Sequence, residues 1–99
     1  MSGRKTERTV IVPLSAPVLA RHVKMRHDSV RERWLILAPE RVLTPDAVAI
    51  AVLRLCDGTR SVEAIARELE QTYNASKERI LGDILPMLQD LVDKKVLGL

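Results

Sequence analysis

The sequence predicts an α+β fold in which a three-stranded antiparallel sheet packs on a bundle of three helices. Between positions 21 and 27 apolar and polar residues alternate, which is the period of a half-buried strand, and residues 34–37 form an apolar run that ends a second expected strand. From position 61 to position 92 the apolar residues recur every three or four places, which is the period of a helix. Of the 99 residues 46% are hydrophobic, yet Phe is absent and Trp34 and Tyr73 are the only Trp and Tyr. A chain of this length and composition is expected to form one domain with an aliphatic core.

Residues 1–20 are expected to form an extended N-terminal arm, and residues 21–99 a single domain. Pro13 and Pro17 forbid a helix in the arm and disfavour a paired strand, because proline has no N–H group. The arm packs either on its own domain or on a second copy of the chain. A homodimer through the arm therefore stays open.

The expected sheet begins with a strand over residues 21–27, whose alternate apolar side chains point to one face. A turn at residues 28–29 leads into a second strand over residues 30–37, so that the two form an antiparallel hairpin. Beyond Pro39, residues 40–43 are expected to form a short third strand at the edge of the sheet.

Thr44 is expected to cap the first helix, with Pro45 at the first helical position, where a missing N–H costs nothing. This helix is expected to run to about Cys56, and Gly58 then suits a left-handed conformation at the helix end. Residues 47–53 are all apolar, which predicts a helix covered on most sides.

Ser61 and Ser76 are expected to cap the second and third helices. Pro86 lies inside the third helical pattern and is expected to kink that helix. The apolar stripes are Val62, Ile65, Ala66 and Leu69 in the second helix, and Ile80, Leu81, Ile84, Leu85, Leu88, Leu91 and Val92 in the third.

Catalytic and metal chemistry find little support in the sequence. His22 and His27 lie five residues apart on one expected strand, which aims them at opposite faces and prevents joint chelation. Cys56 is the single cysteine, so an internal disulfide and a multi-thiolate metal site are both excluded, and a reducing compartment is expected. The glycines form no phosphate-binding loop. We expect a protein that is not an enzyme, with no catalytic residues, no metal and no cofactor.

Charge is distributed unevenly along the chain. Residues 1–41 carry nine Lys and Arg against four acids, whereas residues 42–99 carry seven against nine. The basic half is expected either to face an anionic partner or to be a solvated surface. The first residues lack the apolar segment of a signal peptide, and no run of 18 apolar residues occurs. We therefore expect a cytoplasmic protein without a membrane span.

A winged-helix DNA-binding protein is the alternative function, because short strands with three helices resemble a winged helix-turn-helix. The third helix would be the reader, yet it carries Lys77 and Arg79 against four acids. Contact with DNA requires cations that displace its counterions. Nucleic acid is therefore not expected as a partner.

Peptide binding fits the short edge strand better. Such an edge exposes unpaired N–H and C=O groups, to which an extended peptide can add as one more strand. The flank of the third helix would line the groove, unless its leucines belong to the core. The expected peptide-binding residues are Glu40, Arg41, Val42, Leu43, Thr44, Leu81, Leu85 and Leu88.

Three segments carry a family resemblance through their order and spacing: residues 21–28 (RHVKMRHD), 33–42 (RWLILAPERV) and 55–62 (LCDGTRSV). Together they resemble the PqqD family, pyrroloquinoline quinone (PQQ) biosynthesis protein D, over about residues 17–97. The resemblance implies a RiPP recognition element with a winged-helix-like fold. It implies a peptide chaperone that binds the precursor peptide PqqA and presents it to the radical SAM enzyme PqqE, to which the iron–sulfur chemistry belongs. It places the peptide beside the third strand and the third helix.

Two positions within these segments allow more than one role. Trp34 belongs either to the core or to a surface for a partner, since its indole N–H needs a partner if it is buried. Asp57 and Gly58 are expected to be structural, as a helix stop whose left-handed residue must be glycine.

Overall fold

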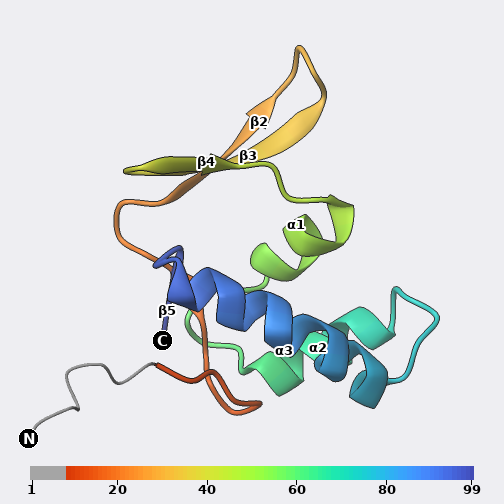
Figure 1. The fold of residues 1–99 in the computed structure, drawn as a ribbon. Coiled ribbons are helices and arrows are strands. Elements are labelled where there is room, and N and C mark those ends of the chain that lie inside the picture. Colours follow the sequence, from red (N-terminus) through yellow and green to blue (C-terminus); the bar gives the residue numbers. More distant parts are fainter. Residues whose placement is uncertain (1–8) are drawn as a thin grey trace, which may run out of the picture.

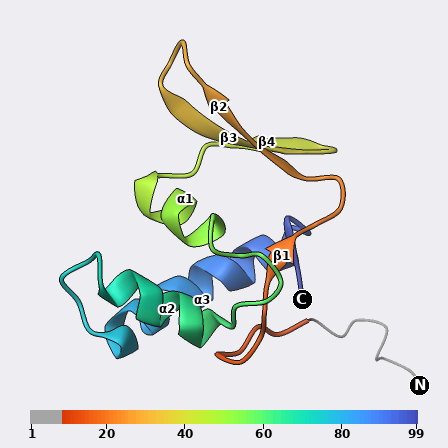
Figure 2. The ribbon, with the colours of Figure 1, turned by 180° about the vertical axis from the view of Figure 1, so that it is seen from behind.

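The computed structural model describes residues 9–99 of the chain. The first eight residues of the expected arm lie outside the described part. The elements, in order, are β1 (Val18–Leu19), β2 (Lys24–Asp28), β3 (Arg33–Ala38), β4 (Arg41–Leu43), α1 (Ala47–Leu53), α2 (Val62–Glu70), α3 (Lys77–Asp93) and β5 (Leu97–Gly98). The sheet of β2, β3 and β4 lies at one end of the molecule, α1 follows it, and α2 and α3 lie beyond α1 (Figures 1 and 2).

The three-stranded sheet has the order β2-β3-β4 and is antiparallel throughout, which confirms the expected hairpin and edge strand. Its register places Met25, Ile36 and Leu43 side by side on one face. Ile36 is 1% exposed and belongs to the same core cluster as the buried residues of the helices. This face of the sheet is therefore the buried one.

The loop between β2 and β3 is longer than the sequence predicted. β3 begins at Arg33, so the expected start at Val30 was wrong. The cause is local: Oδ1 of Asp28 accepts hydrogen bonds from the N–H groups of Val30 and Arg31, which holds these residues in a turn.

A second, two-stranded sheet joins the arm to the end of the chain and was not predicted. β1 pairs antiparallel with β5, with Val18 opposite Gly98. Earlier in the arm, Ile11 is 6% exposed, and its N–H donates to Oε1 of Gln89 on α3 at 2.9 Å. The described part of the arm therefore packs on its own chain, which is the first of the two arrangements that the sequence left open.

The cap of α1 differs from the one expected. Asp46 is the N-cap, and its Oδ1 accepts a hydrogen bond from the N–H of Ala49 at 2.8 Å. Thr44 lies two residues before this cap, so Pro45 precedes the cap instead of following it. Asp caps a helix at least as well as Thr, which is why the choice of Thr44 was wrong.

α1 also ends earlier than expected, at Leu53 and not near Cys56. The chain leaves the helix because Asp57 forms an antiparallel bridge with Val18 of β1. Gly58 has the expected positive φ, +83°, but it lies in the turn after Asp57 and not at the helix end. Ile50, Val52 and Leu53 of α1 are buried, whereas Ala47 and Val48 of its first turn are exposed, so α1 is covered on most sides but not all.

α2 and α3 begin where the sequence predicted. The Oγ atoms of Ser61 and Ser76 accept hydrogen bonds from the N–H groups of Ala64 and Arg79, respectively. Pro86 lies inside α3. The α+β class with three helices is confirmed, and its winged-helix-like character stays a prediction. The buried residues are Val62, Ile65, Ala66 and Leu69 on α2, and Ile80, Ile84, Leu88 and Leu91 on α3.

Candidate functional site

β4 is an edge strand, because within residues 9–99 it pairs with β3 on one side only. A two-residue turn precedes it, so the pair that flanks the turn, Ala38 and Arg41, is the hydrogen-bonded one. Bonded and non-bonded pairs alternate along an antiparallel ladder. The next pair, Leu37 and Val42, is therefore non-bonded, and Val42 directs its N–H and C=O to the unpaired edge.

A hollow of about 420 Å³ lies between the end of β4 and α3, and we call it the β4 groove. Leu43 supplies one wall, and Met87 and Leu91 of α3 supply the other. Met87 and Leu91 are one helical turn apart, so they project from the same face of α3. The remaining lining residues are Ile36, Thr44, Pro45, Asp46, Ala49 and Leu53.

The structure divides the expected peptide-binding residues between several places. Leu43 and Thr44 line the β4 groove, while Val42 points to the opposite face and is 60% exposed. Leu88 is fully buried in the core and lines none of the three hollows. Leu81 and Leu85 are half-buried against the core and line none of the described hollows.

The sequence-based choice of α3 residues missed Met87 and did not assign Leu91 to the groove. Both residues are apolar, as are the leucines that were chosen. Helical periodicity identifies the apolar face of a helix, but it does not identify the element that packs against each part of that face. The spacing of Met87 and Leu91 by four residues was the available signal, but only the position of β4 makes it informative.

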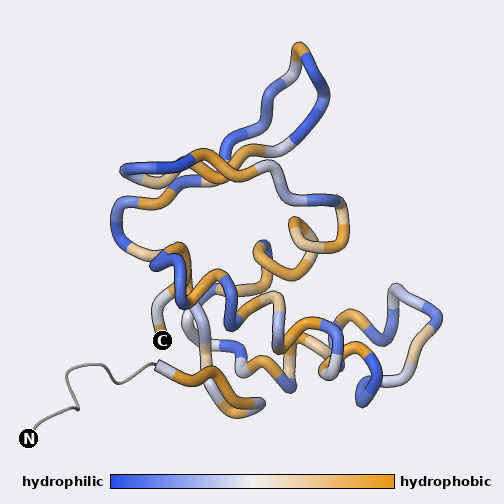
Figure 3. The backbone as a smooth tube through the Cα atoms, in the orientation of Figure 1, coloured by the Kyte–Doolittle hydropathy of each residue, from blue (hydrophilic) through white to orange (hydrophobic). Residues whose placement is uncertain are grey.

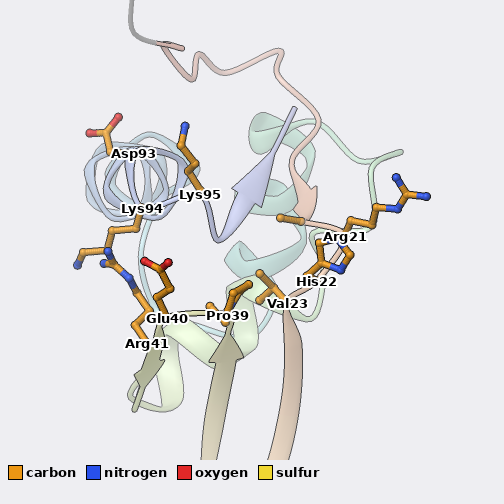
Figure 4. Close-up of a pocket in the computed structure, with 11 residues that line it drawn as sticks. Arg21, His22, Val23, Pro39, Glu40, Arg41, Asp93, Lys94 and Lys95 are labelled. Carbon is orange, nitrogen blue, oxygen red and sulfur yellow. The ribbon is translucent and has the colours of Figure 1, made fainter.

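Glu40 and Arg41 line a second hollow, of about 550 Å³, between the start of β4 and the end of α3 (Figure 4). Arg41 makes no ion pair with any residue in the described part, whereas Nζ of Lys94 lies 2.7 Å from Oδ2 of Asp90. In Figure 4 the side chains of Arg41 and Lys94 extend to the same side of this hollow, next to β4. Both hollows therefore adjoin the unpaired edge of β4.

Trp34 is half-buried and is neither wholly in the core nor a free surface residue. Its ring centroid lies 5.1 Å from that of His27, its partner across the ladder, at an interplanar angle of 59°. The guanidinium carbon of Arg54, just after α1, lies 5.9 Å from the Trp34 ring centroid. Trp34 thus connects the sheet to the end of α1 through a cation–π contact.

Cys56 is 6% exposed, and its Sγ donates to the carbonyl oxygen of Val52 at 3.4 Å. Burial, together with the charge of neighbouring Asp57, raises the pKa of the thiol to about 12. The thiol is therefore protonated near neutral pH and is a poor nucleophile.

Asp57 has a structural role in the turn that follows. Its Oδ1 accepts hydrogen bonds from the N–H and hydroxyl of Thr59 and from the N–H of Arg60. These bonds lower the pKa of Asp57 to about 2.

No group of three or more His, Cys, Asp or Glu side chains is placed to hold a metal ion among residues 9–99. In the same part of the chain, no helix has the length and apolar composition needed to cross a membrane.

Comparison with known proteins adds to this geometry. The family model described as "Coenzyme PQQ synthesis protein D (PqqD)" matches residues 33–97. A "PqqA binding protein" of Rhodopseudomonas palustris (strain BisB5) is 55% identical over 80 residues, which are 81% of this chain and 78% of that protein. The DNA-binding alternative gains no support from these matches.

Two solved structures share the fold. One is the solution structure of the PqqD part of Methylobacterium extorquens PqqCD, described as a functional, stand-alone RiPP recognition element. It is 45% identical with a TM-score of 0.80, and the match covers 92% of this chain and 97% of that one. The other, the crystal structure of PqqD from Xanthomonas campestris, is 36% identical with a TM-score of 0.57, covering 91% and 100%.

Proposed function

The chain belongs to the PqqD family of coenzyme PQQ synthesis proteins, and from that premise we propose that it is a peptide chaperone. It binds a precursor peptide of the PqqA type and presents it to a radical SAM enzyme of the PqqE type. The observation that carries the proposal is the unpaired edge of β4 beside the apolar β4 groove.

The peptide binds by strand addition. It pairs with the N–H and C=O that Val42 directs to the edge of β4, and these main-chain bonds supply affinity for any sequence. Every second side chain of the peptide then enters the β4 groove and contacts Met87 and Leu91. Selectivity comes from these contacts. An acidic residue of the peptide is attracted to Arg41, which makes no ion pair within residues 9–99.

The chain acts as an adaptor and leaves the chemistry to the enzyme. The only thiol, that of Cys56, is buried and protonated, and no cluster of metal ligands occurs among residues 9–99. An edge strand with a groove is a binding surface and supplies no group for catalysis.

Titration of a synthetic PqqA-type peptide into isotope-labelled protein, followed by backbone amide shifts, tests the proposal. We expect the largest shifts at residues 41–44 and at Met87 and Leu91. The amides of α2, on the far side of α3, serve as the internal control and should move little. A folded sample that shows no shifts, or shifts confined to α2, would contradict the proposal.

A further inference from the structure

We propose that the outer face of the three-stranded sheet is the docking surface for the enzyme that modifies the bound peptide. This inference rests on the proposed function, because it concerns what happens to the peptide once it lies on β4. The enzyme would present an apolar patch with an acidic rim to this face.

The outer face is defined by the register of the sheet. One row across it consists of Lys24, Leu37 and Val42, and the next contains Arg26 opposite Leu35. These side chains point away from buried Ile36, because neighbouring residues of a strand alternate between faces. Among residues 9–99 no helix or strand covers this side of the sheet (Figures 1 and 2).

The centre of the outer face is apolar. Leu35 and Leu37 are half-buried, and Val42 is 60% exposed. A shallow hollow of about 370 Å³, lined among others by Arg26, Leu35 and Leu37, lies on the β2–β3 side. Figure 3 shows the apolar stretch along β3 with hydrophilic stretches beside it. An apolar centre with a polar rim is the usual composition of a protein–protein interface.

The rim of the outer face is cationic. Lys24 and Arg26 are exposed and make no ion pair with any residue in the described part. By contrast, Arg31 and Arg33 both lie near the carboxylate of Asp28.

The charges of the sheet segment and of the segment of α2 and α3 differ in the same way. Residues 21–41, which contain β2 and β3, carry six Lys and Arg against three acids, whereas residues 61–93, which contain α2 and α3, carry three against seven. The molecule therefore offers a basic sheet and an acidic helical layer. A partner with acidic groups is attracted to the sheet and repelled by the helices.

The peptide site and the outer face adjoin each other at β4. A guest strand that pairs with Val42 becomes the fourth strand of the same sheet, so half of its side chains continue the outer face. An enzyme docked on Leu37 and Val42 therefore meets the outward side chains of the peptide at the same surface. The side chains in the β4 groove stay covered by α3.

The test compares two charge-reversal variants of equal net charge. The first is Lys24→Glu with Arg26→Glu on the outer face, and the control is Arg67→Glu with Arg79→Glu on the helical layer. Binding of each variant to a PqqE-type enzyme and to a synthetic PqqA-type peptide is measured separately. We expect the sheet variant to bind the enzyme about 10-fold more weakly, with peptide affinity unchanged, and the control to retain both affinities.

Leu37→Ser provides a second variant that leaves the charge unchanged. It should speed dissociation of the enzyme without lowering the affinity for the peptide, because it removes apolar contact from the centre of the outer face. A thermal melt of each variant shows that the fold is retained.

Several outcomes would overturn the inference. If enzyme binding is unchanged in the sheet variants, or is weakened equally by the control, the outer face is not the docking surface. The proposed peptide binding would not be affected by this result. Selective binding of duplex DNA or anionic vesicles to this face, in place of the enzyme, would do the same. Failure of the unaltered protein to bind the peptide would instead overturn the proposed function, and the inference with it.

Discussion

The three-stranded sheet has two outer strands, β2 and β4, and their surroundings differ. Both direct main-chain groups outward within the described part of the chain: by the alternation of the ladder these belong to His27 and Met25 in β2 and to Val42 in β4. β2 reads Lys-Met-Arg-His-Asp, whereas β4 reads Arg-Val-Leu and runs beside the apolar β4 groove.

The difference teaches that an unpaired edge is not by itself a binding site. Charged side chains on an edge strand discourage pairing with other chains, and β2 has three of them. In the proposed binding mode, the edge of β4 would be selective because α3 supplies a wall for the side chains of a guest strand.

The largest effect is expected from Leu88→Ala, which tests whether α3 has a core face distinct from its groove wall. Leu88 is fully buried, so the substitution should lower the free energy of unfolding by about 2–5 kcal/mol. Urea unfolding measures this loss, and titration well below the midpoint should show unchanged peptide affinity. Weak peptide binding with nearly unchanged stability would show that Leu88 contacts the peptide and is not simply a core residue.

Val42→Pro tests whether the edge of β4, and not that of β2, binds the peptide. It removes an N–H that points to the guest and none that points to β3, so peptide affinity should fall by about 10-fold while the sheet survives. His27→Pro removes an outward N–H from β2 in the same way and is the matched control. Calorimetry gives both affinities, and equal losses would show that β4 has no special role.

Met87→Ala should weaken peptide binding by about 5-fold, because it removes part of the groove wall that a guest side chain would contact. Leu81→Ala is the control on the same helix: Leu81 packs on the core and lines no described hollow, so its loss should lower stability but not affinity. If Leu81→Ala weakens binding more than Met87→Ala does, the groove lies along the other side of α3.

The smallest effect concerns Asp57, which lies away from both edges. Its pKa in the folded chain, about 2, is below the ordinary value of 3.8, so the charged carboxylate stabilises the fold. This contribution is complete above pH 3.8 and is lost as the pH falls toward 2. Asp57→Asn should therefore lower the melting temperature near neutral pH, and the difference from the unaltered protein should disappear near pH 2. Peptide affinity should stay the same, and a difference in melting temperature that does not depend on pH would contradict this explanation.

The sequence predicted those parts of the fold that depend on neighbouring residues. The caps Ser61 and Ser76 each accept a hydrogen bond from an N–H group three residues later, and the alternation over residues 21–27 predicts which side chains of that segment face the core. The pairing of β1 with β5 was not predictable, because two-residue strands give no periodic signal and their partners lie almost 80 residues apart.

The groove was predictable on one side only. β4 is short, a proline precedes it and a helix follows it. A proline limits strand pairing on one side, so these features predict an edge strand. The leucines of α3 that face β4 are decided by how α3 packs against α2 and the sheet. Helical periodicity in the sequence carries no information about this tertiary packing. Leu88 and Leu91 look alike in the sequence, yet only Leu91 reaches the β4 groove.

Because Cys56 is buried, the rate at which its thiol is labelled reports how often the core opens. A thiol reagent reacts with the thiolate, and the single thiol of the sequence becomes accessible only when the core around Val52 and Cys56 separates. The labelling rate therefore follows the population of open molecules. A peptide that binds only the closed form should slow labelling by the factor by which it favours that form, and this gives an affinity without any added probe.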